Sequence, residues 1–572
     1  MVNVNDFRRS VSTLSAAERI APRSSKRRVD ALSTWAYFVV LISAILISGI
    51  YTVLPGADNE EHWIGHADAA SVADLARNIA EGRGPYVNHI WILVDGGMPG
   101  SEVTVPVSYW SLYQGYFLSL FFRLFGSTQE TVMLTLWLVR VLIASLGFGL
   151  THWLVGQRFI AFVVGMVLLL HPLMLEVNHN TFDSYLTLVL FSGLVTLLFA
   201  IRSDSKVAFV LAGVAMGVAG AIKVSGFMLP VFFLCYLVIC SKRRQRLKQA
   251  SLVVLGILIG LAPLIHYQKV HFDQLSPVPP ALGKISYANV VIFNTGDYNR
   301  GFYDPTIRHD QYVLTRTQKL QRMADNLGLE ALVRPSGPND RGGPANWFEG
   351  RFLDALRSGE IVPLWMMPFL LIAFVDLIRD AWKRKRIPDE PRAILVFFAL
   401  MFTLGGLALA TQLHTETRYW NFLFPVTLVA SAVAFAARGF PKVLLGVVFI
   451  ILLSTIGSHQ ENFRYYPISE SYRKAKALVP EGAVVMTNNP WEFSYHTRRP
   501  AVMLPYTDSR EAIVSLAKRY GVEYLVIPDR DSRHPYYNGV RDGDPFPDYL
   551  ERVHWEKNLA IGRFAYADPP GF

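Results

Sequence analysis

The residues most able to do chemistry are charged side chains beside long apolar runs, because keeping a charge in apolar surroundings is costly. The first is Asp68, in the segment HADAASVADLARNIAEGRGPYV. At 100° per residue, Asp68 falls within about 40° of Val72, Leu75 and Ile79. The opposite side of this segment carries Asp74, Arg77, Asn78 and Glu81. The pattern predicts a short amphipathic helix with one carboxylate on its apolar side.

Two interpretations of Asp68 stay open. An aspartate near the start of a helix can accept hydrogen bonds from free backbone N–H groups, which is a structural role. A carboxylate that faces a protein cavity can instead act on a substrate. The place of Asp68 on the apolar side of the helix favours the second interpretation.

A second acidic cluster lies in HPLMLEVNHNTFDSYLTLVLF, where Glu176, His179 and Asp183 fall within eight residues. Asp183 directly precedes an apolar run, so it is either a helix cap or a second acid at the same surface as Asp68. Glu176 and His179 would be one helical turn apart. Together the three residues could hold a divalent metal ion, although their spacing matches no recognised metal signature.

Two further groups contain cations. Lys223 stands between two apolar runs in AGAIKVSGF, with no acid nearby in the sequence. It is either a side chain that reaches the membrane surface or a cation that binds phosphate. A mixed group in QLHTETRYWNFLFPV precedes another apolar run and consists of His414, Glu416, Arg418 and Tyr419. Such residues either anchor the end of a span or face a substrate.

Acids and cations of this kind fit one reaction, the transfer of a sugar from a lipid phosphate. A carboxylate within hydrogen-bond reach can take the proton from an acceptor hydroxyl. Lysine and arginine can stabilise the negative charge that grows on the departing phosphate. Because the lipid reaches the site sideways from a bilayer, such a site belongs at the membrane surface. We therefore expect Asp68 to face inward at membrane depth.

The elements that must position these residues are membrane spans. The chain of 572 residues has a mean hydropathy of +0.28 and 17% charged residues, against about 25% in soluble proteins. The net charge of +10 lies in short loops between apolar runs, which is typical of a membrane protein and not of a nucleic-acid partner. Eleven runs are long enough to be spans, at about 35–54, 131–154, 159–176, 184–201, 207–222, 225–240, 251–267, 361–379, 392–411, 420–437 and 442–457.

Positive charge sets the orientation of these spans. The first 33 residues are polar and basic, without a signal peptide, and the loops 241–248 and 379–386 each carry five basic residues. All three segments share the cytoplasmic side only if the aromatic segment 107–125 does not cross the membrane. We therefore expect 107–125 to lie along the outer surface of the bilayer.

This orientation predicts three parts of the chain. Residues 1–33 form a cytoplasmic tail, and residues 34–457 form the membrane domain, with outer loops 55–130 and 268–360. Residues 458–572 lie outside the cytoplasm, where SESYRKAKALVPEGAVVMTNNP, RRPAVMLP and DSREAIVSLAKRYGVEYLVIP predict a small α/β domain. No glycine-rich phosphate loop accompanies these strands, so no nucleotide site is expected there.

Seven motifs, taken in order, resemble the GT-C superfamily of polyprenyl-phosphate-sugar glycosyltransferases, in the branch of the protein O-mannosyltransferases and lipid A aminoarabinose transferases. They are GHADAASVADLARNIAEGRG, FRLFGST, HP…TFDSYLTL, GAIKVSGF, ETRYWNFLFPV, LVPEGAVV and YGVEYLVI. The resemblance covers most of the chain. It implies a mostly α, polytopic membrane protein with a GT-C helical bundle, juxtamembrane helices and a small C-terminal extracytoplasmic α/β domain.

By the same resemblance, Asp68 matches the catalytic acid of the first outer loop, and Asp183 matches the acid of the second. Lys223 and Arg418 match positions that are expected to hold the lipid phosphate. The chain departs from the pattern where relatives carry a second acid, since an alanine follows Asp68, and where they carry Lys-Pro-Pro, since VTVPVSYW stands there. Arg83 could take the place of the missing lysine.

We therefore expect an integral glycosyltransferase of the inner or plasma membrane. It would pass a sugar from a polyprenyl-monophosphate donor, with inversion, to a glycan, lipid or protein acceptor outside the cytoplasm, and a divalent metal ion is the one cofactor to consider. A transporter or flippase of lipid-linked sugars is the alternative, but it would show paired halves, and no internal repeat is visible. A non-catalytic scaffold would leave the charged groups unrelated in space.

Overall fold

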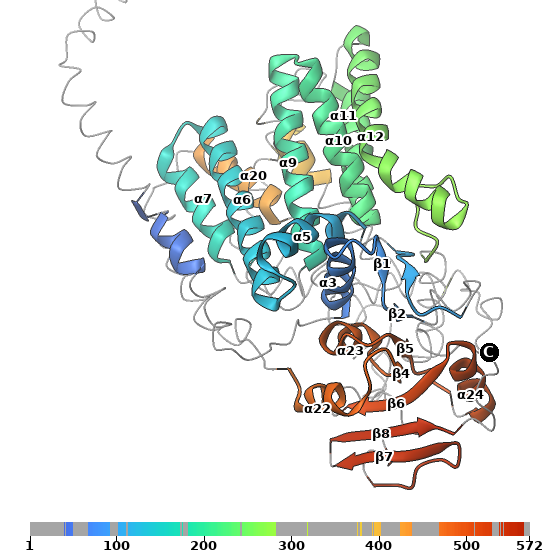
Figure 1. The fold of residues 1–572 in the computed structure, drawn as a ribbon. Coiled ribbons are helices and arrows are strands. Elements are labelled where there is room, and N and C mark those ends of the chain that lie inside the picture. The colour runs from blue at the N-terminus through green and yellow to red at the C-terminus, as the bar shows by residue number, and fades with distance from the viewer. Residues whose placement is uncertain are drawn as a thin grey trace, which may run out of the picture.

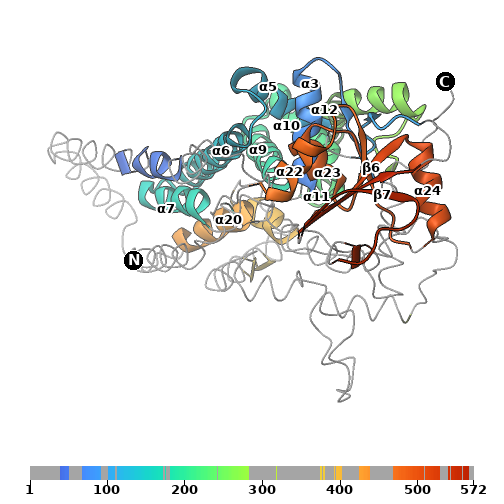
Figure 2. The ribbon, with the colours of Figure 1, turned by 60° about the horizontal axis from the view of Figure 1, so that its bottom comes forward.

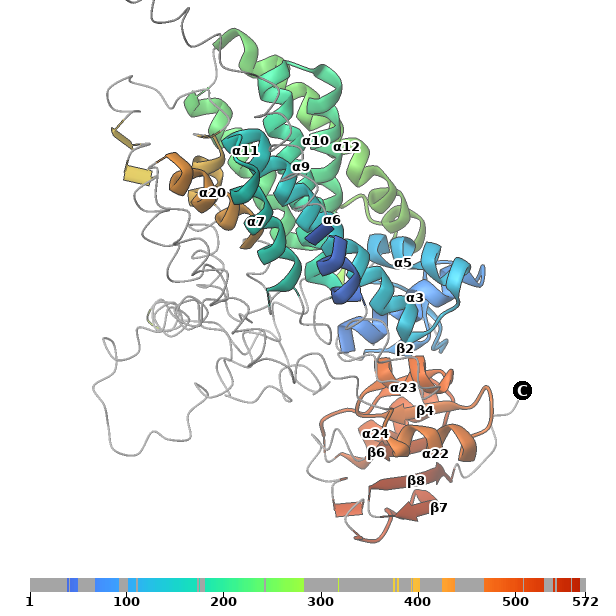
Figure 3. The same cartoon turned by 90° about the vertical axis from the view of Figure 1, so that its left-hand side faces the viewer.

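The computed structural model describes residues 39–40, 42–49, 67–91, 101–109, 112–171, 174, 181–240, 243–281, 317, 374–375, 378–379, 392, 394–401, 424–437, 468–507, 509–528, 537, 539–540, 543–556 and 558–565. Within these ranges the chain forms a helical bundle, two short helices at one end of the bundle, and a mixed sheet beyond them (Figures 1 and 3).

The predicted apolar runs form the helices of the bundle. These helices are α6 (Gln129–Val155), α7 (Arg158–Leu170), α9 (Thr181–Ser203), α10 (Lys206–Ile222), α11 (Met228–Cys240), α12 (Arg243–Phe272) and α20 (Phe424–Ala437). Among the described residues, the segments long and apolar enough to cross a membrane are Gln129–Val155, Ser184–Ser203 and Leu247–Phe272. A mostly helical, multi-pass membrane protein is therefore confirmed. The runs 35–54, 159–176, 361–379, 392–411 and 420–437 are described only in part, and 442–457 lies outside the described residues.

One boundary in the bundle differs from the prediction. The basic stretch 241–248, expected as a loop, is mostly helical, because α12 begins at Arg243. Lysine and arginine are good helix formers, so a run of them need not interrupt a helix. A run of basic residues therefore does not show where a helix starts.

Four glycines bring α10 and α12 close together. They are Gly213 and Gly217 on α10, and Gly256 and Gly260 on α12. A Cβ atom at Gly217 would lie 2.5 Å from Ile257 O and 3.2 Å from Gly260 Cα. Glycines four residues apart allow membrane helices to approach this closely. The contact sets the position of the end of α10, where Lys223 lies.

Two helices of 14 residues each lie at one end of the bundle (Figure 1), namely α3 (Ala67–Ala80) and α5 (Leu112–Phe125). The length of α5 is about 21 Å, which is shorter than the roughly 30 Å apolar core of a bilayer. The bundle helices α7 and α20 are no longer than this, but α5 lies with α3 at the end of the bundle (Figure 1), which agrees with the expectation for 107–125.

The two sides of α5 have different surroundings. Its inner side packs on α3, where a Cβ atom at Gly115 would lie 2.5 Å from Leu75 Cδ2. Its outer side exposes Tyr116, Leu120 and Leu124, which are four residues apart and so lie on one face. An exposed apolar face on a helix beside the bundle is typical of a helix that lies in a membrane surface.

The C-terminal residues build most of a six-stranded sheet in the order β2-β5-β4-β6-β8-β7. Its strands are β2 (His89–Ile90), β4 (Val484–Thr487), β5 (Ala501–Met503), β6 (Val522–Pro528), β7 (Leu550–Glu556) and β8 (Leu559–Phe564). β4 pairs in parallel with β5 and β6, and β8 pairs antiparallel with β6 and β7. The predicted strands β4, β5 and β6 are confirmed, whereas β7 and β8 were not predicted.

One strand of this sheet comes from the segment between the first two predicted spans, which is called the first outer loop after the side on which it was predicted to lie. β2 pairs in parallel with β5, with His89 opposite Ala501 and Ile90 opposite Val502. A short antiparallel pair from the same loop consists of β1 (Tyr86–Val87) and β3 (Val105–Pro106). The loop and the C-terminal residues are therefore joined by backbone hydrogen bonds.

Three helices accompany the sheet, namely α22 (Glu470–Leu478), α23 (Pro490–Thr497) and α24 (Arg510–Arg519). The predicted helices α22 and α24 are confirmed, and each begins at a serine cap, Ser469 and Ser509. The unpredicted helix α23 lies between the sheet and α3 (Figure 2). Through α23 the C-terminal domain reaches the helix that carries Asp68.

Candidate active site

The helix α3, which carries Asp68, is covered on both sides. Its apolar side packs in the core below α5, as predicted. Its polar side faces α23 and not solvent, so Asp74 is 0% and Arg77 only 3% exposed. Asp68 lies in the first turn and is half-buried. The apolar side of the helix thus packs below α5, and its polar side packs against α23.

Arg77 joins α3 to the last turn of α23. Its Nη1 donates to the carbonyl of Tyr495 at 2.8 Å, and its Nη2 lies 3.4 Å from the carbonyl of Ser494. The guanidinium also stands 5.1 Å from the centre of the Tyr495 ring and pairs with Asp74. Because a helix C-terminus carries partial negative charge, a cation is favoured there.

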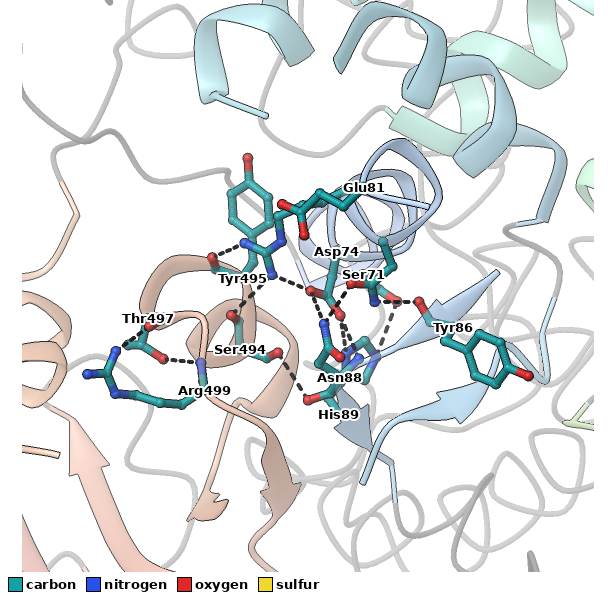
Figure 4. A network of polar contacts seen from close by, with 12 residues as sticks. Ser71, Asp74, Glu81, Tyr86, Asn88, His89, Ser494, Tyr495, Thr497 and Arg499 are labelled. Atoms are coloured by element: carbon teal, nitrogen blue, oxygen red, sulfur yellow. Dashed lines mark hydrogen bonds and ion pairs between the residues drawn. The ribbon is translucent and has the colours of Figure 1, made fainter. Parts of the chain in front are cut away.

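Asp74 joins α3 to the segment that leads into β2 (Figure 4). The Asn88 N–H donates to Asp74 Oδ2 at 2.7 Å, and the Asn88 amide donates to Oδ1 at 3.1 Å. His89 Nδ1 lies 3.6 Å from Asp74 Oδ2, and His89 Nε2 lies 3.3 Å from Ser71 Oγ. Ser494 closes the ring of contacts, since its hydroxyl donates to Asn88 O at 3.0 Å.

The surroundings of Asp74 decide its chemical role. Burial by itself raises the pKa of the Asp74 carboxyl, but Arg77, His89 and the Asn88 N–H together lower it more. The pKa of Asp74 therefore lies well below its usual range, and the carboxylate stays ionised. A fully buried carboxylate with this many donors is a weak proton acceptor. Asp74 therefore has a structural role.

Three of the predicted site residues lie at the same end of the bundle. Helices α9 and α10 pack together and are joined by the short turn Asp204–Ser205, so the start of one lies beside the end of the other. Asp183 is in the first turn of α9, and half-buried Lys223 ends α10, where its N–H donates to Ala219 O at 3.1 Å. The helix α3, with Asp68, contacts α9 and α5, and Tyr185 near the start of α9 packs on Phe117 of α5.

Of the other predicted site residues, the structure describes the side chain of Arg83. Arg83 is exposed in the turn after α3, and it pairs with Glu81. The side chain of Asp183 and the residues Glu176, His179, His414, Glu416, Arg418 and Tyr419 lie outside the described residues. Among the residues that are described, no three His, Cys, Asp or Glu side chains gather in a way that could hold a metal ion. The predicted metal group stays a prediction.

A separate pocket of about 360 Å³ lies between the first outer loop, α5 and α12. Its lining includes Tyr113, Tyr116, Tyr267, His266 and His271, and the described residues that line it include no lysine, arginine or acid. Pro85 also lines it, and Pro85 follows the C-terminal end of α3, whereas Asp68 lies at the N-terminal end. The pocket is therefore distinct from the surroundings of Asp68.

The sequence analysis missed the ring of Asp74, Arg77, Asn88 and Ser494. One signal was present, because Asp74 and Arg77 are three residues apart and so can pair on one helix face. Their burial was not visible, since it depends on α23, whose carbonyl at Tyr495 is 418 residues from Arg77.

Comparison with known proteins indicates the class of protein to which this geometry belongs. A family model described as dolichyl-phosphate-mannose-protein mannosyltransferase matches residues 111–267. No curated protein matches the chain. The solved structure of the archaeal oligosaccharyltransferase AglB from Archaeoglobus fulgidus, in complex with an inhibitory peptide and a dolichol-phosphate, is 13% identical, with a TM-score of 0.56 over 88% of this chain and 71% of that chain.

Two further solved structures are similar. An Archaeoglobus fulgidus oligosaccharyltransferase in complex with Zn and sulfate is 14% identical, with a TM-score of 0.53 over 87% of this chain and 69% of that chain. ArnT from Cupriavidus metallidurans in the apo state is 14% identical, with a TM-score of 0.43 over 93% of this chain and 98% of that chain.

The AglB likeness and the arrangement of membrane helices beside a C-terminal domain define the fold, and the family match defines the class, a membrane glycosyltransferase of the GT-C type. Over residues 111–267 the chain is similar to the dolichyl-phosphate-mannose-protein mannosyltransferase family. The resemblance that the motifs predicted is thereby confirmed.

Proposed function

We propose that the protein transfers a sugar from a polyprenyl-monophosphate donor to an acceptor outside the cytoplasm, with inversion at the anomeric carbon. The acceptor hydroxyl oxygen forms the new bond to that carbon while the bond from carbon to phosphate oxygen breaks. The hydroxyl proton passes to the Asp68 carboxylate. The polyprenyl phosphate leaves with the bonding electrons.

The observation that carries this proposal is the position of Asp68. It is half-buried in the first turn of α3, at the end of the bundle where α9 begins and α10 ends. That end is also where the apolar face of α5 lies, so a lipid substrate in the outer leaflet would be within reach. The other acid of the helix, Asp74, is occupied by its structural contacts.

The remaining residues have proposed roles around Asp68. Asp183 orients the substrate or binds a metal ion together with Glu176 and His179. Lys223 and Arg418 hold the phosphate and stabilise its charge as it leaves. Substrate contacts are also proposed for His414, Glu416, Tyr419 and Arg83.

The donor class is supported by the relatives. The matching family is described by a dolichyl-phosphate sugar, and the AglB structure contains a dolichol-phosphate. Polyprenyl phosphates stay in the bilayer, which suits a site at the membrane surface. We place the N-terminus in the cytoplasm and the C-terminal domain outside the inner or plasma membrane, on the evidence of the basic loops. The acceptor is a glycan, lipid or protein of the cell envelope.

The test replaces Asp68 by asparagine, which removes the proton acceptor with little change in volume. A strain that lacks the protein is complemented with wild type, Asp68→Asn or Asp204→Asn, and envelope glycans, glycolipids and glycoproteins are compared by mass spectrometry. Asp204 is a matched control, because it is an exposed aspartate in the α9–α10 turn with a φ of 48°, which asparagine tolerates.

We expect the Asp204→Asn strain to regain the missing sugar and the Asp68→Asn strain to lack it, with transfer reduced about 100-fold or more. Immunoblots establish that the two variants reach the membrane in equal amounts. Normal sugar transfer by Asp68→Asn at that level would remove Asp68 from the mechanism.

A further inference from the structure

The ring of contacts between α3, α23 and the segment before β2 has a geometry that a simple packing contact lacks. Arg77 reaches two carbonyls of α23 and one carboxylate of its own helix. Asp74 receives the Asn88 N–H, and Ser494 donates back to Asn88 O. Each of the three elements is therefore bonded to both of the others.

Part of the face that α3 presents to its neighbours consists of alanines. Ala69, Ala70, Ala73 and Ala76 are buried, with at most 2% of each exposed. Methyl groups pack well but do not select one rotation or one axial shift of a helix, because van der Waals contact is not directional. Hydrogen bonds from a planar guanidinium are directional. The ring and the neighbouring hydrogen bonds of Asn78 to Tyr86 O and Asn88 can therefore set the register of α3, and within them Arg77 is the side chain that bonds to the C-terminal domain.

Asp68 is on the same helix, six residues before Asp74, and so about 9 Å away along the helix axis. A helix of this length moves as a rigid unit, so the register set at Asp74 and Arg77 also sets the direction in which Asp68 points. Buried ion pairs contribute little net stability compared with apolar side chains of the same size. Their contribution to a unique arrangement can be larger.

We propose that Arg77 is a positioning residue, through which the C-terminal domain holds the Asp68 carboxylate in place for proton transfer. This proposal rests on the proposed function of Asp68. It gives the C-terminal domain a part in the reaction that requires no contact with the sugar or the acceptor.

The experiment uses the full chain in lipid nanodiscs, with a synthetic polyprenyl-monophosphate sugar that carries the sugar identified by the envelope analysis. Arg77→Lys keeps the charge but cannot reach both carbonyls and the carboxylate in the same plane. We expect kcat to fall at least tenfold, while the KM for the donor stays within a factor of two. Ser494→Ala removes only the hydrogen bond to Asn88, and we expect it to lower kcat several-fold. This milder variant tests the proposal if Arg77→Lys does not fold.

A double-mutant comparison separates positioning from loss of folded protein. A positioning residue acts through Asp68, so Arg77→Lys should not lower the residual rate of Asp68→Asn further. A merely structural defect would lower the rate by the same factor in both backgrounds. The matched control is Lys474→Met, which breaks a partly exposed pair with Glu556 in the same domain and should leave kcat unchanged.

Two results would overturn the proposal. The first is that Arg77→Lys and Ser494→Ala both have a kcat within a factor of two of wild type. The second is that Arg77→Lys lowers the rate by the same factor in the wild-type and Asp68→Asn backgrounds. If Asp68→Asn itself retains full activity, the proposed function fails as well. If Asp68→Asn is inactive while Arg77→Lys is normal, only the positioning role fails.

Discussion

Asp68 and Asp74 lie on one helix, yet their surroundings give them different capacities. Asp74 is fully buried against Arg77, Asn88 and His89, and its pKa is held well below the usual range by these partners against the opposing effect of burial. Asp68 is half-buried in the first turn. At the scale of single residues, what a carboxylate can do here depends on the donors around it and not on its place in the sequence.

A pH dependence follows from His496, a buried residue of α23. Burial, with lesser contributions from nearby Arg77 and Lys476, lowers the pKa of His496 from 6.5 to about 3. The unfolded chain therefore binds this proton first as the pH falls. The stability that comes from neutral His496 is complete above pH 6.5 and is lost between pH 6.5 and about 3, at up to about 1.4 kcal/mol per pH unit.

The measurement is thermal unfolding of wild type and His496→Gln in detergent between pH 7.5 and 4, followed by tryptophan fluorescence. Glutamine does not titrate, so the advantage of wild type over the variant should shrink as the pH falls. A difference in Tm that stays constant from pH 7.5 to 4 would show that His496 does not titrate with unfolding.

At the scale of secondary-structure elements, close helix contacts position the end of α10. The helix α10 presents Gly213 and Gly217 to Gly256 and Gly260 of α12, and Tyr113 of α5 donates to the Gly260 carbonyl at 2.6 Å. Small residues bring the two backbones together and leave a carbonyl within reach of α5. The end of α10, with Lys223, is thus placed by contacts along the whole helix.

Gly213→Ala tests this contact. The added methyl group would overlap Val253 O and approach Gly256 Cα, so the two helices must move apart. We expect a loss of about 1–3 kcal/mol, seen as a lower apparent Tm in detergent. Gly149→Ala on α6 is the matched control, since its Cβ would meet nothing within 4 Å. Equal Tm values for the two variants would contradict the close packing of α10 and α12.

At the scale of the whole molecule, the first outer loop and the C-terminal domain form one sheet. β2 adds to the edge strand β5, and α23 covers α3 (Figures 2 and 3). Asp68, although close to the first span in the sequence, is held between the membrane bundle and a domain at the other end of the chain.

The orientation of the whole molecule can be measured by labelling single cysteines in a variant without Cys235 and Cys240. Arg244→Cys, in the first turn of α12, should resist an impermeant maleimide in intact cells and react after permeabilisation. Lys518→Cys, exposed on α24 of the C-terminal domain, should react in cells whose outer barrier is opened. The reverse pattern would place the C-terminal domain in the cytoplasm.

Much of the fold could be predicted because its signals are local. Apolar length marks the helices α6, α9 and α12, and serine caps and a glycine stop mark α22, α24 and β6 in the tail. The fold class and the enzyme class were also predicted, from motifs in a fixed order. Of the candidate site, the sequence predicted which charged residues stand beside apolar runs, and Asp68, Asp183 and Lys223 do share one end of the bundle.

Only the tertiary structure decided which charges are structural. The polar side of α3 suggests a solvated face until α23 covers it, and β2 is too short to be recognised until β5 pairs with it. Arg77 and the Tyr495 carbonyl are 418 residues apart in the chain. Periodicity and spacing reflect the nearest turns of the backbone, whereas burial and pKa depend on whatever the folded chain brings into contact, and that is why the structural role of Asp74 could be seen only in three dimensions.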